Sequence, residues 1–475
     1  MGVISARAAD RADFIDHQAV SQAVDRGACL AEDRGFVEQV LAKAREAKGL
    51  EPLEAAALLQ IKDPQVLEGM FHMAREIKER IYGRRIVLFA PLYVSNYCVN
   101  QCAYCGYKCS NRGFERRRLT MEELEEEVRI LEGLGHKRLA LEAGEDPENC
   151  PLDYILECIG KIYSLKFDNG SIRRVNVNIA ATTVEEYRRL KEAGIGTYVL
   201  FQETYHRPTY QAMHPSGPKS SYDWHTTAMD RAMEAGIDDV GLGVLYGLYD
   251  HVYDTVAMLY HAKHLEERFG VGPHTISVPR LRKAHGVDLS GFRPVDDHDF
   301  KKVVAVIRLS VPYTGMILST REEAGFRDQV ISLGISQISA GSCTGVGGYA
   351  EHYVNRPVDE KPQFEVGDHR SPMEIIKSLM RSGYIPSYCT ACYREGRTGD
   401  RFMSLAKSGQ IGNVCQPNGL LTLKEFLLDY GDDEAKVIGE SLIERELESI
   451  PNPKAREAAR GMLGRIESGE RDLRF

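Results

Sequence analysis

Short apolar runs alternate with longer amphipathic runs through the middle of the chain, and a turn follows each pair. The short runs suit strands and the longer runs carry the 3.6-residue period of helices, so the pattern predicts consecutive βα units. Eight units fit within about 260 residues, the usual size of a (β/α)8 TIM barrel. The strands are predicted at residues 86–94, 138–143, 174–180, 197–203, 240–248, 275–281, 315–320 and 337–341.

Helix ends support this α/β interpretation. Thr120 with Glu123, and Thr183 with Glu186, form the spacing of capping boxes. Glycines suited to the left-handed end of a helix stand at Gly135, Gly194, Gly236 and Gly334. A doubly wound open sheet is the alternative fold, but no Gly-x-Gly-x-x-Gly follows the first predicted strand. We therefore predict the barrel.

The flanking regions differ from the barrel. Residues 1–84 predict an N-terminal helical region, with amphipathic stretches at 36–48 and 63–81. The barrel is expected over 85–350. A polar, proline-bearing connection at 357–372 then leads into a mainly helical C-terminal domain, predicted over 351–475.

Composition limits the possible partners and compartment. A formal net charge of -9 and a pI of 5.9 argue against broad nucleic-acid binding, which needs clustered basic residues. The N-terminus lacks the apolar core of a secretory signal, and no apolar stretch has membrane-spanning length. The eleven cysteines predict reduced thiols and metal ligands in a cytoplasmic protein.

One cysteine triplet follows the first predicted strand. Cys98, Cys102 and Cys105 are therefore expected in a loop at the C-terminal mouth of the barrel, where barrel enzymes place their chemistry. Three thiolates on an iron-sulfur cube leave one iron free to bind a reactant. Zinc and buried thiols are the alternatives, and zinc would want a fourth ligand, for which only Cys109 is near. Cys109 itself is interpreted as a small buried thiol.

A second triplet lies in the tail. Cys389, Cys392 and Cys415, spaced Cys-x2-Cys-x22-Cys, also lack a fourth cysteine close by. A structural zinc knuckle is the alternative, but no histidine follows His369, and a three-thiolate iron cluster is favoured. Arginines that could offset its negative charge stand nearby at Arg394, Arg397 and Arg401.

The first loop, with Tyr104 as the aromatic residue of Cys-x3-Cys-x-aromatic-Cys, resembles the radical S-adenosylmethionine (SAM) superfamily. The resemblance implies a 4Fe-4S cluster that binds SAM and generates a 5'-deoxyadenosyl radical. Gly144 and Glu145 resemble that superfamily's motif for the methionine amino group, with alanine in place of its first glycine. Gln202 and Glu203 end the fourth predicted strand, where polar side chains commonly reach the SAM ribose or carboxylate.

The tail triplet resembles that of the HydG family, the tyrosine-cleaving maturases of [FeFe]-hydrogenases. The related 2-iminoacetate synthases (ThiH) share the barrel and tyrosine cleavage but lack the triplet. The resemblance implies cleavage of L-tyrosine at Cα–Cβ to p-cresol and dehydroglycine. It implies further that dehydroglycine becomes carbon monoxide and cyanide on an iron of an auxiliary 4Fe-4S cluster, for assembly of the hydrogenase active site.

The same resemblance implies an additional iron at the auxiliary cluster, bound partly by a histidine and by a free cysteine molecule. His274, which opens the sixth predicted strand, is the expected ligand, with His261 and His264 as alternatives. A low-potential electron donor and other hydrogenase maturation proteins are the implied partners.

For the tyrosine carboxylate we expect Arg321, with Ser319 beside it, because a guanidinium can bind a carboxylate through two hydrogen bonds. Arg280 and Arg282 are alternatives. Two other functions stay open: 2-iminoacetate synthesis for thiamine, and an iron-sulfur scaffold or electron-transfer protein without SAM chemistry.

Overall fold

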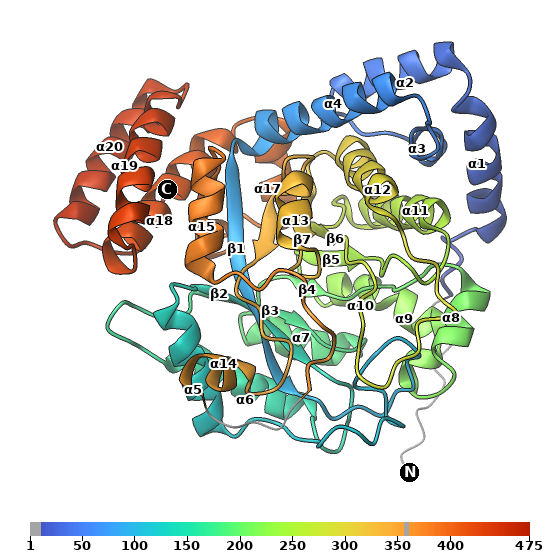
Figure 1. Ribbon diagram of the computed structural model, residues 1–475, viewed down its shortest axis with the longest axis horizontal. Coiled ribbons are helices and arrows are strands. Elements are labelled where there is room, and N and C mark those ends of the chain that lie inside the picture. Colours follow the sequence, from blue (N-terminus) through green and yellow to red (C-terminus); the bar gives the residue numbers. More distant parts are fainter. Residues whose placement is uncertain (1–10, 356–360) are drawn as a thin grey trace.

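The computed structural model describes residues 11–355 and 361–475, and its centre is a closed barrel of parallel strands (Figure 1). Each strand pairs with the next, and β1 pairs with both β2 and β8, which closes the ring. The predicted α/β barrel is confirmed. Its strands are β1 (Arg85–Ser95), β2 (Arg138–Ala143), β3 (Arg174–Asn178), β4 (Tyr198–Val199), β5 (Val240–Gly243), β6 (Thr275–Ser277), β7 (Gly315–Leu318) and β8 (Gln337–Ser339).

Most strands are shorter than predicted. The fourth was expected at 197–203, yet β4 spans only Tyr198–Val199 before the chain leaves the sheet, with a single bridge later at Glu203. The apolar runs continue past the strand ends because the loops at the mouth are themselves buried. Apolar content alone therefore does not mark where ladder hydrogen bonding stops.

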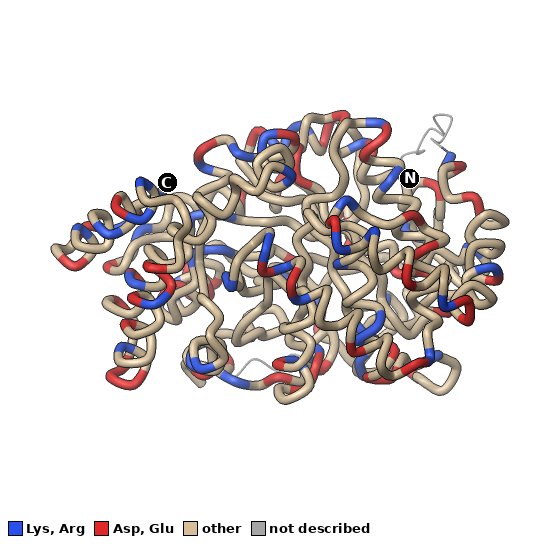
Figure 2. The backbone as a smooth tube through the Cα atoms, turned by 90° about the horizontal axis from the view of Figure 1, so that it is seen from above, with Lys and Arg blue, Asp and Glu red and all other residues tan. Residues whose placement is uncertain are grey.

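Helices surround the barrel and connect its strands. Both predicted capping boxes are present, at Thr120 and Thr183, and the four predicted helix-ending glycines all have positive φ. Acidic and basic residues are interspersed along these outer segments (Figure 2). The elements between the strands are α5 (Met121–Gly133), α6 (Leu152–Ser164), α7 (Val184–Glu192), α8 (Arg207–Met213), η1 (Pro218–Ser220), α9 (Tyr222–Thr226), α10 (Ala228–Glu234), α11 (His251–Phe269), α12 (Asp297–Ser310), α13 (Ala324–Ile331) and, after β8, α14 (Gly348–Val354).

Four helices precede the barrel and lie together along one side of it (Figure 1). Two of them coincide with the predicted amphipathic stretches, and the other two are additional. Helix α4 packs against α12, and α3 packs against α11 and α12. The N-terminal helices are α1 (His17–Leu30), α2 (Arg34–Arg45), α3 (Pro52–Leu59) and α4 (Pro64–Tyr82).

The C-terminal region is mainly helical, as predicted, but it also supplies a strand. Residues 385–387 of β9 (Ile385–Ser387) pair in parallel with residues 85–87 of β1, on the edge that β2 occupies further along. The tail is thereby joined to the N-terminal end of the barrel, here called the floor. Its helices are α15 (Pro372–Arg381), α16 (Ala391–Arg394), α17 (Gly399–Lys407), α18 (Gly412–Asp429), α19 (Asp433–Glu448) and α20 (Pro453–Glu467).

Some predictions fall partly outside the described residues. The predicted N-terminal region includes residues 1–10, and the predicted connection includes residues 357–360, all outside the described residues. Domain boundaries at 84 and 350 stay predictions. Within the described residues, no helix combines the length and apolarity needed to cross a bilayer.

Candidate active site at the two ends of the barrel

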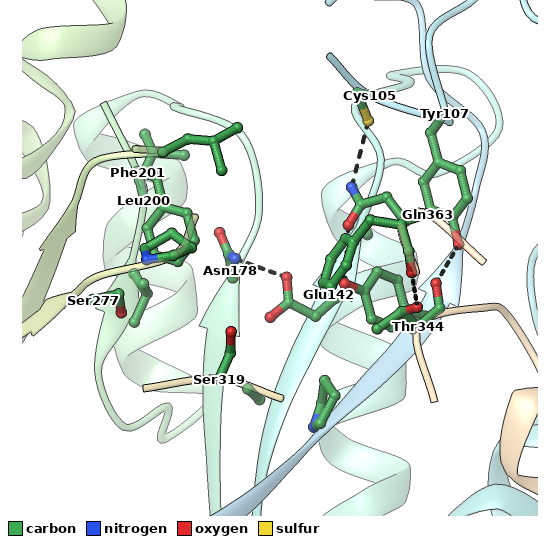
Figure 3. Close-up of a pocket in the computed structure, with 18 of the residues that line it drawn as sticks. Cys105, Tyr107, Glu142, Asn178, Leu200, Phe201, Ser277, Ser319, Thr344 and Gln363 are labelled. Atoms are coloured by element: carbon green, nitrogen blue, oxygen red, sulfur yellow. Dashed lines mark hydrogen bonds between the residues drawn. The ribbon is translucent and has the colours of Figure 1, made fainter. Parts of the chain in front are cut away.

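A cavity of about 240 Å³ occupies the mouth of the barrel, where the first cysteine triplet was expected. Its lining includes Cys98, Cys102 and Cys105, and Figure 3 shows Cys105 at one end of it. The Gln363 amide donates to the Cys105 sulfur at 3.6 Å, and the Asn100 amide lies 3.9 Å from that of Cys98. Burial raises the pKa of all three thiols, to about 11 for Cys105, so a bound metal would have to favour the thiolates.

The turn after β2 packs tightly against the loop that carries the first cysteines. A Cβ added to Gly144 would lie 2.3 Å from the carbonyl oxygen of Tyr97, so glycine is required beside the cysteine loop. Gly144 N–H donates to Ser95, and the carbonyl of Glu145 accepts from Val99 N–H. These bonds tie the motif to the loop that carries the first cysteines. Three thiols around open space beside this turn are a suitable donor set for an iron-sulfur cluster and its ligand.

Acidic side chains reach the same cavity from two strand ends. Glu145 accepts a hydrogen bond from Asn100, and burial raises the pKa of its carboxyl group. Glu203 has a left-handed φ of 70° and pairs with Lys219 at 2.7 Å. Lys219 also lines the cavity. The structure thus brings Glu145 and Glu203 together beside the cysteine loop.

Of the two other predicted cofactor residues, one lines the cavity and one does not. Tyr104 lines the cavity, and its hydroxyl is 2.8 Å from Nε2 of His214. Gln202 does not line it: its amide donates to Thr226 Oγ1 at 2.9 Å, on the helix-facing side of the chain. Gln202 and Glu203 therefore do not share this cavity.

Arg321 and Ser319 both line the cavity, as predicted for a carboxylate site. The Arg321 guanidinium stacks 3.4 Å from the centre of the Phe364 ring, and among the described residues it forms no ion pair. Arg280, by contrast, pairs with Glu322 and does not line the cavity. Arg321 is therefore the better placed cation. Arg282 lines the cavity too, but it pairs with an exposed acid at the rim.

Several residues that line the cavity were not predicted from the sequence. Glu142 points into the cavity from β2 and accepts from the Asn178 amide at 2.7 Å (Figure 3). Burial raises the pKa of Glu142 to about 8, so this carboxyl group is protonated near neutral pH. Ser277 from β6 and Gln363 from the predicted connection also face inward. The available signal was strand alternation, since Glu142 stands two residues after Ala140 on the inner face.

The second triplet assembles at the floor. Cys389 follows β9, Cys392 lies on α16 and Cys415 on α18. The Cys415 thiol hydrogen-bonds to Cys392 and, together with Arg85 and Arg397, holds the pKa of Cys392 below its ordinary value. Among residues 11–355 and 361–475, no three Cys, His, Asp or Glu side chains converge as tightly as ligands of a single ion. Cluster thiols bind different irons and are spaced more widely.

His274 joins this second site. It lines a floor cavity of about 40 Å³ together with Cys389 and Cys392. Its buried Nδ1 lies 3.4 Å from Asp239, which leaves Nε2 as the nitrogen available to the cavity. Burial lowers the pKa of His274, which favours the neutral imidazole that binds metals. The two alternative histidines lie on α11 and have other partners. His261 hydrogen-bonds with Tyr205, and His264 hydrogen-bonds with Asp230.

The two cavities lie one above the other along the barrel axis. On each of four strands, the residue that lines the floor cavity is followed two positions later by a residue that lines the mouth cavity. Two-residue steps keep side chains on the same face of a strand. The four pairs are Val87 and Phe89, Arg138 and Ala140, Gly315 and Ile317, and Gln337 and Ser339.

Comparison with known proteins agrees with this architecture. The sequence model of the radical SAM superfamily matches residues 92–262, and that of the biotin and thiamin synthesis associated domain matches residues 277–385. The chain is 32% identical to 2-iminoacetate synthase of Escherichia coli over 72% of its own length and 88% of that protein.

Two solved structures extend the similarity to the tail. A crystal structure of HydG, a maturase of the [FeFe]-hydrogenase, has 64% identity and a TM-score of 0.93, covering 98% of this chain and 100% of that one. HydG from Carboxydothermus hydrogenoformans has 38% identity and a TM-score of 0.80, covering 94% and 99%. The chain belongs to the HydG family. As a radical SAM enzyme, it is expected to hold a 4Fe-4S cluster and SAM at the first triplet.

In this member of the HydG family, two expectations from the sequence need correction. Cys109 is exposed: its N–H donates to Asn100, which holds the turn at the surface. The tail arginines are also mostly engaged elsewhere, with Arg394 paired to Asp472 and only Arg397 beside Cys392. The cation that interacts with all three tail thiols is Arg85, which comes from β1 and is distant in sequence.

Proposed function

We propose that this protein cleaves L-tyrosine at Cα–Cβ to p-cresol and dehydroglycine and then converts dehydroglycine to carbon monoxide and cyanide. One observation carries the proposal. The second triplet lies with His274 at the floor of the barrel, and the first triplet lies at the mouth of the same barrel. A 2-iminoacetate synthase needs only the mouth site. An electron-transfer scaffold needs no cavity of about 240 Å³ lined by a guanidinium that forms no ion pair among the described residues.

At the mouth, Cys98, Cys102 and Cys105 would hold the SAM-binding cluster, which supplies the 5'-deoxyadenosyl radical. Glu145 and Glu203 would orient SAM, since both carboxyl groups lie beside the loop. They can accept hydrogen bonds from the amino group and the ribose hydroxyls.

Arg321 and Ser319 would bind the tyrosine carboxylate, Arg321 through two N–H donors. The cavity lining includes aromatic side chains, Tyr93, Phe201 and Phe364, that can pack against the phenol ring. A fixed carboxylate and a fixed ring would present the amino group in one orientation to the radical. A low-potential electron donor is required for each turnover.

The barrel interior would carry the two-carbon remainder from mouth to floor. Small or polar residues line the two cavities where they share strands, among them Ala140 and Ser339 at the mouth and Gly315 at the floor. An enclosed route limits contact with water, in which an imine would hydrolyse.

At the floor, Cys389, Cys392 and Cys415 would hold the auxiliary cluster. The additional iron is cargo, and His274 Nε2 together with a free cysteine molecule would bind it while Asp239 keeps the imidazole in position. Carbon monoxide and cyanide on this iron would then pass to other hydrogenase maturation proteins.

One anaerobic assay tests the proposal. The iron-loaded protein is incubated with reductant, SAM, cysteine and tyrosine, and 5'-deoxyadenosine, p-cresol, carbon monoxide and cyanide are measured. All four products are expected. Absence of 5'-deoxyadenosine and p-cresol would refute the enzyme, and p-cresol without carbon monoxide or cyanide would instead support 2-iminoacetate synthesis.

A further inference from the structure

Arginine occupies the first position of three neighbouring strands. Arg85 begins β1, Arg138 begins β2 and Arg174 begins β3. Because the strands are parallel, their N-terminal ends meet at the barrel floor. Arg85 and Arg138 line the same cavity as Cys389 and Cys392. Positive charge is therefore concentrated inside the barrel at the second cysteine site.

Among the described residues, no carboxylate forms an ion pair with these guanidinium groups. Arg138 is 4% exposed, and the Nε atoms of Arg85 and Arg138 are buried without a hydrogen-bond partner. In the described part of the chain, neither side chain forms an ion pair, whereas the buried Arg327 pairs with Asp368. A buried guanidinium without an anion is costly, so this arrangement indicates a bound anion that completes the site.

The neighbouring groups do not remove the need for an anion. Tyr393 packs against Arg138 and Arg174, with ring-centre distances of 5.3 and 4.1 Å, but it is neutral. Asp239 accepts from the backbone N–H of Gly399 and lies 3.4 Å from His274, and among the described residues it forms no ion pair with Arg85 or Arg138. A four-iron, four-sulfide cluster on the three tail thiolates would keep a small net negative charge, which Arg85 beside these thiols offsets, and Arg138 is left without an anion of its own.

Size restricts the anion. The floor cavity measures about 40 Å³, whereas one water needs about 10–15 Å³ on such a measure. A molecule of a few heavy atoms therefore fits, and SAM or tyrosine does not. The donors of a guanidinium match a carboxylate in geometry as well as in charge.

We propose that Arg85 and Arg138 form a binding site for a small carboxylate beside Cys389. The identity of the ligand rests on the proposed function, in which the remainder of tyrosine is a two-carbon acid. The site holds that acid next to the cysteines and His274. Arg85 approaches from β1 and Arg138 from β2, so the carboxylate is placed at the end of the barrel axis, beneath the mouth cavity.

Glyoxylate, a stable two-carbon oxo acid, is the probe. It is titrated anaerobically into the cluster-loaded protein by calorimetry, and the electron paramagnetic resonance of the auxiliary cluster is recorded with and without it. We expect binding and a changed spectrum. Arg138→Gln should weaken binding about tenfold or more, because a charged hydrogen-bonding partner is lost, and Arg138→Lys should weaken it less.

Arg26→Gln, at an exposed position on α1, is the matched control and should bind like wild type. Arg321→Gln removes the mouth cation and should leave the Arg138-dependent binding intact. Binding that depends on Arg321 and not on Arg138 would overturn the inference. Glycolaldehyde lacks the carboxylate and should not bind.

The wild-type protein tests the site even if the variants fail to fold, since an unchanged auxiliary-cluster spectrum with glyoxylate would overturn the inference. Formation of p-cresol from tyrosine is followed separately. If wild type forms no p-cresol, the proposed function fails, whereas the glyoxylate measurement still decides whether the carboxylate site exists.

Discussion

The two cysteine sites share a ligand set but differ in construction. At the mouth, Cys98, Cys102 and Cys105 belong to one short loop around a cavity of about 240 Å³, lined by charges of both signs. At the floor, the cysteines come from separate segments, and the cavity of about 40 Å³ beside Cys389 and Cys392 has arginines as its charged lining residues. The mouth suits two organic molecules, and the floor suits a small anion and a metal ion.

The largest expected effect separates the two sites. Cys389→Ser should abolish carbon monoxide and cyanide but retain p-cresol, because the mouth is untouched. Cys102→Ser, the matched variant at the mouth, should abolish every product. Product analysis by chromatography and by infrared spectroscopy of bound ligands measures both. Equal loss of p-cresol in Cys389→Ser would contradict separate roles.

The next effect concerns the mouth cation. Arg321→Gln should raise the KM for tyrosine by about 10- to 100-fold, since one charged hydrogen-bonding partner of the carboxylate is removed. Steady-state p-cresol formation measures it. Arg282→Gln is the control and should change KM far less, because that side chain pairs with an exposed acid. A larger rise in KM for Arg282→Gln than for Arg321→Gln would instead assign the binding of the tyrosine carboxylate to Arg282.

A smaller effect should follow from the residue behind His274. Asp239→Asn should weaken binding of the additional iron by about tenfold, the usual scale for loss of a carboxylate behind a metal-binding histidine. Iron content and the spectrum of the auxiliary cluster report it, and p-cresol formation should persist. Asp238→Asn is the neighbouring control, since Asp238 contacts Thr398 and not His274. Equal iron loss in both variants would indicate a general disturbance of α17.

The smallest effect concerns stability and pH. The pKa of Glu142 is raised from 4.5 to about 8 by burial, so the folded apo protein binds more protons than the unfolded chain between these values. Stability should therefore fall as pH rises through this window. In Glu142→Gln, the free energy of unfolding should fall by about 1–3 kcal/mol less than in wild type over this pH window. Urea denaturation at several pH values measures it. Glu148→Gln changes an exposed carboxylate and is the control. Its stability should fall with rising pH as much as that of wild type does.

The same comparison shows what sequence can reveal. The mouth cysteines are contiguous and follow a recognisable strand, so loop, barrel and position were predictable together. Arg321 and His274 were predicted because each stands next to a strand end, and each lines a cavity. Glu142 was missed because only the register of β2 decides that its side chain faces inward.

The floor was harder to predict because its parts are distant in sequence. Arg85, Arg138 and Arg174 come together only when parallel strands align their first residues. A signal did exist: a charged residue at the start of three successive apolar runs is unusual for buried strands. Strand β9 was missed because it is short and lies among helices.

The pairing of β9 with β1 has a mechanical consequence. Because β1 carries the closing ladders of the barrel and also the ladder to the tail, the tail cannot detach without breaking main-chain bonds of the strand that begins the barrel. Barrel and tail should therefore resist pulling and protease digestion as one unit. A force applied to the C-terminus would reach β1 before it reached any loop at the mouth.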